Sequence, residues 1–276
     1  MTEVTFWGTR GSIACANPNY IEFGGHTSCV SLLIEEQLLI FDAGSGLYDL
    51  GEWIQKSKPN IKHVDLFLTH FHYDHVMGLP FFAPLWNSDF HITIHHASSN
   101  SCENLVKSFV KQRLFSEPFF PVPFEKIPSR IDLKEHILTA SFALSPGLLV
   151  YTQGLNHPGE ATGYRIEYKG KVFSYVTDTE HTPGELDKKI LNLISHADLA
   201  IYDATFTDEE FKEKKGWGHS TWQQGVWLAQ EAGVKKLAFF HHAPSHTDDI
   251  LNAIEQEAQA LLPSSFVARQ GTTVIL

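Results

Sequence analysis

Residues 70–75 contain His-Phe-His-Tyr-Asp-His, so four potential metal ligands occupy six consecutive positions. An apolar run at residues 64–68 precedes them and predicts a strand that ends where the ligands begin. Because side chains alternate along a strand, His70 and His72 are expected on one side. Asp74 and His75 follow directly after these two histidines, so the loop can turn their side chains toward a second metal position nearby. Zinc and similar metals select this nitrogen and carboxylate set, so the segment predicts a site for two metals.

The chain has 276 residues and a formal net charge of −11. This length suits one large domain with a substantial core, and we expect a single domain over residues 1–276. The acidic balance argues against a broad basic surface for nucleic acid. A long nucleic acid is therefore a poor default substrate.

Cysteine usage and hydropathy give the cellular context. Cys15, Cys29 and Cys102 are odd in number and lack CxxC spacing, so we interpret them as buried or free thiols in a reducing compartment. The first residues alternate like a strand and lack the order of a signal peptide. No apolar run approaches the ~20 residues that span a membrane. A cytoplasmic protein without membrane contact is the expectation.

Short apolar runs rich in β-branched or aromatic residues predict strands. They lie at residues 4–7, 30–34, 38–41, 64–69, 91–94, 148–151, 163–168, 171–177, 199–202, 237–240 and 272–276. Apolar residues three and four apart predict helices at residues 103–114, 183–195, 222–232 and 248–262. Strands concentrated in the first half, then strand–helix alternation, indicate an α/β domain of sheets covered by helices.

The stretch from about residue 80 to residue 130 differs, because six prolines stand among many phenylalanines. Its residues 117–124 are Glu-Pro-Phe-Phe-Pro-Val-Pro-Phe, which excludes a helix or a central strand. We interpret residues 80–130 as an insertion that covers the metal site or forms a subunit contact, and we expect a homodimer built on it. An apolar loop packed on its own core is the alternative.

A dinuclear site needs more ligands than one loop supplies, so His or acidic residues are expected after other strands. His157, Asp178 and His241 each stand at or just after the end of an apolar run. Each alone is a weak indication, since strand ends commonly carry capping or hydrogen-bonded polar residues. Together with residues 70–75 they form a matched set of metal ligands.

With these residues in place, the chain resembles the metallo-β-lactamase-fold hydrolases. The pattern of that superfamily is an early Asp after a strand, then HxHxDH, a His, an Asp and a final His. Here Asp42, the segment 70–75, His157, Asp178 and His241 supply it in order. The resemblance covers nearly the whole chain. It implies an αβ/βα sandwich of two facing mixed sheets covered by helices, with the site at one edge.

The resemblance also implies a role for each residue of the pattern. It assigns one metal to His70, His72 and His157, the other to Asp74, His75 and His241, and the bridge between them to Asp178. Asp42 would be a buried acid that orients the ligand loop. His242 follows the last ligand, and strand alternation sends it to the opposite side. Two zinc ions are the expected cofactors, and the same ligands also suit manganese or iron.

The types of ligand residue restrict which reactions of the superfamily this site suits. A redox diiron member would carry Glu where this chain has His72, and the best-known β-lactamases carry Cys where Asp178 stands. A carboxylate bridge instead resembles the phosphodiesterases, ribonucleases and glyoxalase-like thioesterases of the superfamily. Two bridged zinc ions suit in-line displacement at phosphorus, and we expect Asp74 among the catalytic residues.

Residues 200–206 and 218–221 resemble the HEAT and HST motifs of the tRNA 3′-processing endonuclease tRNase Z, with Asp203 in place of its Glu. His219 precedes a predicted helix, whose backbone N–H groups and positive dipole end suit an anionic phosphate. Oriented by Asp203, His219 would stabilise the transition state and protonate the leaving oxygen. The structural alternatives are capping and core roles, including a capping box that begins at Ser220.

The chain departs from tRNase Z where that family carries its tRNA-gripping arm. Residues 162–171 lead by a tight hairpin straight toward Asp178, which leaves no room for the arm. With the acidic charge, this favours a small phosphodiester such as a cyclic nucleotide as the substrate. The alternatives are an ester, thioester or lactone hydrolase, a tRNA 3′-processing-like ribonuclease, and a non-catalytic metal-stabilised ligand-binding protein. Substrate contacts by Arg10, His26 and His242 are left open.

Overall fold

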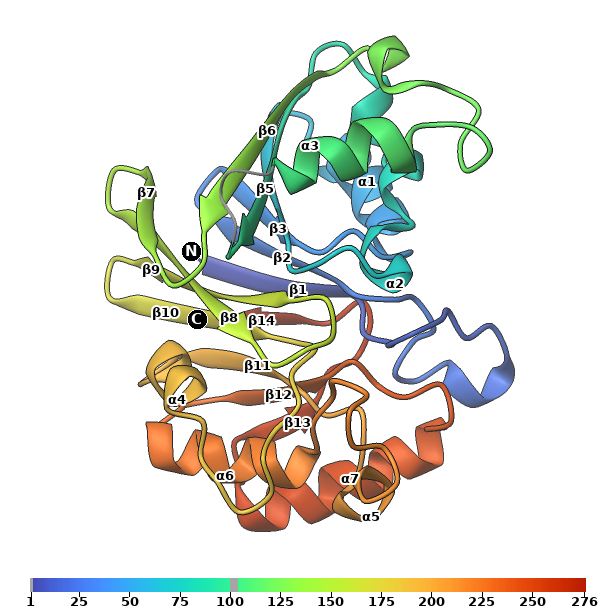
Figure 1. Ribbon diagram of the computed structural model, residues 1–276. Coiled ribbons are helices and arrows are strands. Elements are labelled where there is room, and N and C mark those ends of the chain that lie inside the picture. The colour runs from blue at the N-terminus through green and yellow to red at the C-terminus, as the bar shows by residue number, and fades with distance from the viewer. Residues whose placement is uncertain (1, 100–103) are drawn as a thin grey trace.

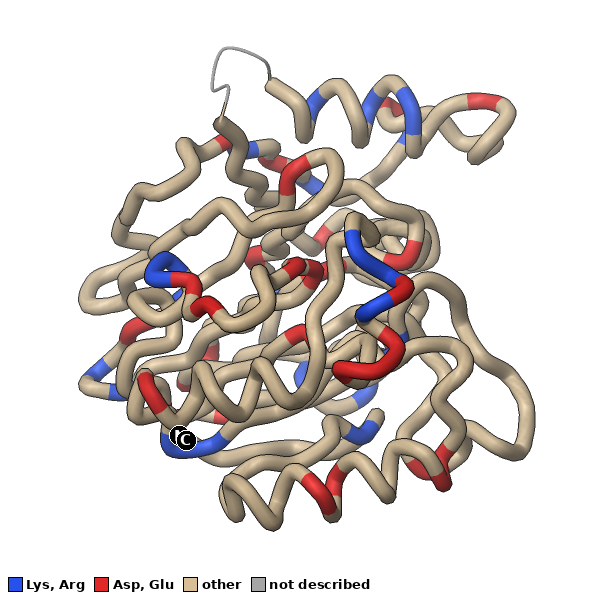
Figure 2. Tube along the Cα trace, turned by 60° about the horizontal axis from the view of Figure 1, so that its bottom comes forward, with Lys and Arg blue, Asp and Glu red and all other residues tan. Residues whose placement is uncertain are grey.

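The computed structural model describes residues 2–99 and 104–276. Two seven-stranded sheets lie against each other, and helices cover their outer faces (Figure 1). The α/β sandwich expected from the sequence is confirmed. Lys and Arg are interspersed with Asp and Glu along the trace in the view of Figure 2. Among the described residues, no helix combines the length and hydropathy needed to cross a membrane.

The first sheet has the strand order β14-β1-β2-β3-β4-β5-β6. Its strands are antiparallel from β14 to β3 and parallel from β3 to β6. They are β1 (Thr2–Gly8), β2 (Cys29–Ile34), β3 (Gln37–Phe41), β4 (His63–Leu68), β5 (His91–Ser98), β6 (Arg130–Ile137) and β14 (Thr273–Ile275).

The second sheet has the order β13-β12-β11-β10-β9-β8-β7. Strands β13 to β10 run parallel, and β10 to β7 are antiparallel. They are β7 (Ser141–Ser145), β8 (Leu148–Leu155), β9 (Ala161–Tyr168), β10 (Lys171–Val176), β11 (Leu199–Asp203), β12 (Leu237–Phe240) and β13 (Ser265–Val267).

Helices flank the sandwich on both sides. Helix α1 packs on the first sheet, and α4, α6 and α7 pack on the second. The α-helices are α1 (Leu47–Ser57), α2 (Tyr73–Val76), α3 (Leu105–Phe109), α4 (Lys188–Ile194), α5 (Asp208–Phe211), α6 (Trp222–Ala232) and α7 (Asp248–Leu261). Short 3₁₀ or π turns are η1 (Pro18–Tyr20), η2 (Leu79–Phe81), η3 (Ala83–Trp86), η4 (Val110–Leu114) and η5 (Phe124–Lys126).

Alternation along the strands divides the buried side chains among separate cores. In β4, Leu66 faces the helix side, whereas Phe67 faces the opposite sheet. Between the sheets, the Phe41 ring stacks on Phe67 and also packs against Tyr175. This aromatic layer lies directly beneath the strand ends that carry the predicted ligands.

Several expectations need correction. Strands β6, β7 and β13 and helix α1 were not expected from the sequence, and the helix expected at 183–195 begins later, where Asp187 caps α4. The range 80–130 is not wholly an insertion, because β5 pairs with both β4 and β6. Cys15 and Cys29 are free thiols, as expected. Cys102 and the first residue of the helix expected at 103–114 lie outside the described residues.

Strand direction determines where the site forms. Strands β3 and β4 run parallel in one sheet, and β10, β11 and β12 run parallel in the other. β8 has the direction of β10, because both are antiparallel to β9. Parallel strands end at the same edge of a sheet, so the carboxyl ends of all these strands gather polar residues at one edge of the sandwich.

Candidate metal centre and active site

All seven predicted metal ligands meet at this edge. Residues 70–75 follow β4, His157 follows β8, Asp178 follows β10 and His241 follows β12. Asp178 and His241 have φ of 57° and 61°, a left-handed conformation that is uncommon outside glycine and turns each side chain out of its strand. Strain of this kind is characteristic of functional sites.

One group of potential ligands consists of His70, His72 and His157, whose ligand atoms all lie within 4.8 Å of one another. The Nδ1 of His72 is 3.1 Å from the Nε2 of His157. His70 and His157 are buried, whereas His72 is exposed. This group is therefore open to solvent on the side of His72.

A second group consists of Asp74, His75 and His241. The Nε2 of His241 is 3.1 Å from Oδ2 of Asp74 and 3.3 Å from the Nε2 of His75. All three residues are buried.

Asp178 lies between the two groups. Its Oδ1 is 3.2 Å from the Nε2 of His75 and 3.5 Å from that of His241. Its Oδ2 is 3.8 Å from the Nε2 of both His70 and His157. One carboxylate oxygen therefore faces each group, which is the arrangement that a bridging ligand needs.

The outer nitrogens of four of these histidines are held by hydrogen-bond acceptors. Nδ1 of His75 lies 2.8 Å from Asp42, and that of His157 lies 2.8 Å from the Gly218 carbonyl oxygen. Nδ1 of His70 and of His241 lies 3.0 and 2.9 Å from the hydroxyls of Thr69 and Thr205, respectively. A ring that donates through Nδ1 keeps a lone pair on Nε2, and here the Nε2 atoms face inward.

These inward nitrogens fit bound cations. The Nε2 of His70 is buried without a hydrogen-bond partner among the described residues, and the Nε2 atoms of His75 and His241 face each other. Burial lowers the pKa of His75, but the charges of Asp178 and Asp74 outweigh it and raise the pKa well above its usual value. The pocket thus favours positive charge at its centre. A pair of divalent cations satisfies both the lone pairs and the carboxylates.

Asp42 occupies the position expected of an orienting acid. It is fully buried, and its carboxylate accepts hydrogen bonds from the Thr69 backbone N–H at 2.8 Å and the Tyr175 hydroxyl at 3.0 Å, besides the bond to His75. These bonds tie the start of the ligand loop to both sheets.

His219 and Asp203 form a pair beside the ligands. The Nδ1 of His219 is 3.0 Å from Oδ2 of Asp203 and 3.8 Å from Oδ2 of Asp178. Burial lowers the pKa of His219, but the charge of Asp203 overcomes this and raises the pKa to about 9. The His219 ring packs against the rings of His157 and His241, at centroid distances of 5.3 and 4.7 Å. It therefore borders both groups of ligands.

The structure places three other residues outside this centre. Arg10 is fully buried, and its guanidinium donates to the carbonyl oxygens of Gly24 and His246. His26 lies 3.0 Å from the Ser45 hydroxyl. His242 points away from His241 and lies 2.9 Å from the carbonyl oxygen of Ala268. Burial and these contacts assign Arg10 and His242 to structural roles.

The Gly-rich segment around Arg10 supports the centre through its backbone instead. The Ser12 N–H donates to Oδ2 of Asp74 at 2.7 Å. A Cβ atom on Gly11 would lie 2.3 Å from the His241 ring, so only glycine fits there.

The capping box expected at Ser220 is not the cap of α6. Thr221 caps this helix, whereas Ser220 bonds to His181 and Tyr202.

Sequence reasoning did not anticipate Gly218 and Glu180. The Glu180 carboxylate accepts backbone N–H bonds from Gly216 and Gly218 at 2.8–2.9 Å. Gly218 in turn orients His157 through its carbonyl oxygen. The sequence signal was the Gly-Trp-Gly run just before His219, which indicates a backbone of unusual conformation.

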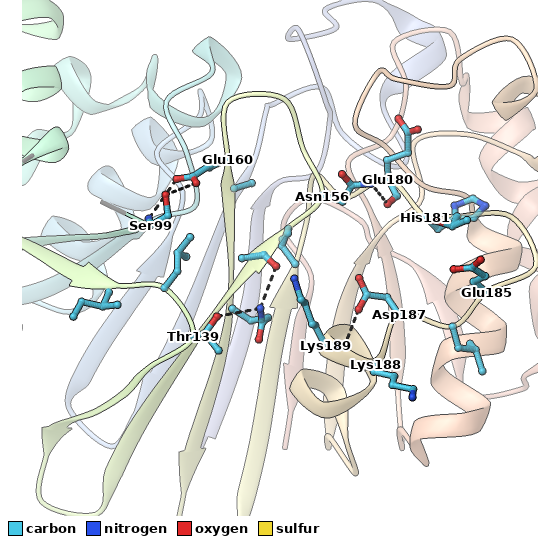
Figure 3. A pocket seen from close by; sticks show the side chains of 18 residues that line it. Ser99, Thr139, Asn156, Glu160, Glu180, His181, Glu185, Asp187, Lys188 and Lys189 are labelled. Carbon is cyan, nitrogen blue, oxygen red and sulfur yellow. Dashed lines mark hydrogen bonds between the residues drawn. The ribbon is translucent and has the colours of Figure 1, made fainter. Parts of the chain in front are cut away.

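A cavity of about 930 Å³ is lined by residues that neighbour two of the ligands in sequence, but by none of the seven ligands themselves. Figure 3 shows Asn156, Glu180 and His181 on one side of it and Glu160 and Ser99 on the other. Asn156 immediately precedes His157, and Glu180 follows Asp178 by two positions. The volume lies in the range of pockets that hold small molecules.

The comparison with known proteins agrees with this geometry. A family model described as a beta-lactamase superfamily domain matches residues 38–242. The chain belongs to the beta-lactamase superfamily. Within this superfamily it is a metallo-β-lactamase-fold hydrolase, as the sequence motifs indicated. That family is built around a dinuclear metal site, which the His and Asp groups here match.

Alignments with known proteins cover nearly the whole length of this chain. Ribonuclease Z of Methanosarcina acetivorans is 25% identical over 293 residues, which cover 91% of this chain and 90% of that protein. The metallo-beta-lactamase fold protein YhfI from Bacillus subtilis superposes with a TM-score of 0.71 at 17% identity, over 99% of this chain and 98% of that one. The short form of human tRNase Z superposes with a TM-score of 0.67 at 20% identity, with the same coverage.

Proposed function

We propose that this protein is a dinuclear metal-dependent phosphodiesterase that acts on a small phosphodiester such as a cyclic nucleotide. The observation that carries the proposal is the His219–Asp203 pair, with 3.0 Å between Nδ1 and Oδ2, beside a site where Asp178 faces two groups of ligands. Hydrolysis of a phosphodiester needs a proton donor for the leaving oxygen next to the phosphoryl group. His219 would be that donor.

The ligand groups described above would hold two divalent cations, with zinc the preferred pair and manganese or iron also suited to these ligands. Bound there, the cations would polarise the phosphoryl oxygens. The protein side chains perform the proton transfers. Asp74 would accept the proton of the attacking water, and His219 would give its proton to the leaving oxygen, while Asp203 holds the His219 ring in place.

The connection between β9 and β10 supports a small substrate. The two strands end and begin at Tyr168 and Lys171, so only a two-residue turn joins them. No arm for gripping tRNA lies between His157 and Asp178. The net charge of −11 also disfavours a long polyanion.

A tRNA 3′-processing-like ribonuclease is the second candidate, favoured by the relatives named Ribonuclease Z. Both candidates share the same chemistry and differ in substrate size. Purified, metal-loaded protein should be assayed on a cyclic-nucleotide panel and on a tRNA precursor with a 3′ extension. We expect higher kcat/KM on a cyclic nucleotide. Cleavage of the precursor alone would replace the first candidate with the second.

A carboxylic ester, thioester or lactone substrate is tested by His219→Ala. We expect this variant to lose phosphodiesterase activity, because the leaving oxygen of a diester needs a proton donor. A wild-type enzyme that hydrolyses lactones or thioesters but no phosphodiester would contradict the proposal. A ligand recovered intact after long incubation with metal-loaded protein would indicate a binding protein instead.

We also propose a homodimer formed through the Pro- and Phe-rich segment. Phe81 and Phe119 are 60% and 70% exposed, and the ring of Phe81 contacts Phe120 at 5.9 Å between centroids. Exposed aromatic side chains of this kind are characteristic of interfaces. Light scattering should give a dimer mass that Phe119→Ser reduces, whereas a monomer mass for the wild type would contradict the proposal.

A further inference from the structure

Trp217 is an exposed aromatic side chain at the border of the metal centre. It is 58% exposed, more than Trp86 at 38% or Trp227 at 36%. Tryptophan combines an apolar ring with a polar N–H and is enriched at binding interfaces. The surroundings of this ring therefore indicate what it would bind.

The backbone on both sides of Trp217 is fixed to the metal centre. Gly216 and Gly218 donate their N–H groups to the Glu180 carboxylate, which also lines the cavity of about 930 Å³ (Figure 3). Gly218 contacts His157 through its carbonyl oxygen at 2.8 Å. Both glycines have positive φ, 85° and 83°, so the loop has a defined shape. Trp217 is thus an exposed ring on an ordered backbone.

A lysine side chain packs on this ring. The Nζ of Lys214 lies 4.3 Å from the centre of the Trp217 ring. Lys212 is paired with Glu209, and Glu213 stands between the two lysines in sequence. Lys214 is therefore the one cation of this segment that contacts the indole.

We propose that Trp217 is a stacking platform for the nucleobase of a nucleotide substrate, which would bind on the ring face opposite Lys214, with the Lys214 ammonium adding a positive charge beside it. This inference rests on the proposed phosphodiesterase function and names the substrate class as a nucleotide diester. Every nucleobase presents a π-face to an aromatic ring, and a nearby cation strengthens the attraction for an anionic nucleotide. The scissile phosphate would lie at the metal ligands, and the base would extend to the loop two residues before His219.

Binding of AMP tests the platform without turnover. AMP and ribose 5-phosphate, which lacks the base, should be titrated into the metal-loaded protein, with Kd measured by calorimetry and by quenching of tryptophan fluorescence. We expect AMP to bind about 5- to 100-fold more tightly than ribose 5-phosphate, the range that stacking of one base supports. Trp217→Ala should abolish this preference, and Trp217→Phe should retain most of it.

Trp86→Ala provides a matched control, because Trp86 is also partly exposed, at 38%, but belongs to η3. It should leave the preference for AMP unchanged. Lys214→Met should weaken binding of AMP and ribose 5-phosphate alike. The Kd of a six-nucleotide RNA should be measured with the same variants, and its comparison with the Kd of AMP shows whether the protein prefers RNA or a small nucleotide. Trp217→Ala is expected to weaken the binding of either ligand.

Equal affinity of the wild type for AMP and ribose 5-phosphate, or an unchanged preference in Trp217→Ala, would overturn the platform. If the wild type still hydrolyses phosphodiesters in that case, the proposed function survives. If Trp217 gives a base preference but no phosphodiester is hydrolysed, the platform stands as a nucleotide-binding feature and the proposed function fails.

Discussion

The Nδ1 of His219 lies 3.0 Å from Oδ2 of Asp203, and the same carboxylate also accepts N–H bonds from Thr179 and Thr205. Asp203 is therefore fixed by the backbone before it contacts the imidazole. A ring held in this way presents its other nitrogen in a constant direction. The pair couples β11, which carries Asp203, to the loop that precedes α6.

Asp203→Asn should lower kcat on phosphodiesters by about 10- to 100-fold, because the amide loses the charge that holds His219 protonated. Metal content, measured by elemental analysis, should stay at the wild-type value, since Asp203 is not a predicted ligand. Loss of metal together with activity would show that Asp203 acts on the ligands rather than on His219.

Gly218→Ala should reduce metal affinity. A Cβ atom there would lie 2.3 Å from Nδ1 of His157 and 2.4 Å from Pro158, so the histidine must move. Gly216→Ala is the matched control, because its φ is also positive but nothing lies within 4 Å of the added atom. The control should show only the modest loss of stability that a left-handed alanine costs, about 1 kcal/mol. Equal metal affinity in the two variants would refute the assigned role of Gly218.

Asp42→Asn should weaken metal binding by about 10- to 100-fold, the usual effect of removing the partner that orients a ligand. The amide nitrogen cannot accept the Nδ1–H of His75, so the ring loses its fixed orientation. Competition with a chromogenic chelator measures the affinity. Wild-type affinity in this variant would mean that packing alone positions His75.

His136 should make folding stability depend on pH. Burial, aided by the charges of His95 and Lys134, lowers the pKa of His136 to about 4. The unfolded chain binds a proton near pH 6.5, so this stabilisation is complete above pH 6.5 and is lost as the pH falls toward 4. The free energy of unfolding, measured with urea, should fall less for His136→Gln than for the wild type when the pH is lowered from 7 to 5.

The comparison of the two proteins cancels every contribution to the pH dependence that they share. Parallel loss of stability in wild type and His136→Gln would rule out His136 as a source of the pH dependence.

The metal ligands could be predicted from sequence because each follows a strand whose apolar pattern is clear, and parallel strands end together. The roles of Gly218 and Glu180 were not predicted, because these residues act through backbone hydrogen bonds. The type of a residue does not show where a backbone N–H points. Arg10 was a candidate for substrate contact by its type, yet its guanidinium is enclosed by backbone carbonyl oxygens.

The strands that were missed lie at the edges of the sheets. β6 and β7 are each the last strand of a sheet, and their residues are mostly intermediate or exposed, so no buried face produces an alternating pattern. Helix α1 did carry a signal, since its buried Leu47, Leu50 and Ile54 have helical spacing.

Titration of metal-free protein with zinc, while turnover of bis-p-nitrophenyl phosphate is followed, tests the two-metal phosphodiesterase most directly. We expect hydrolysis to rise as metal binds and to level off at about two equivalents, because Asp178 presents one oxygen to each group of ligands. Full activity at one equivalent, or no turnover at two equivalents of zinc, manganese or iron, would contradict the proposal.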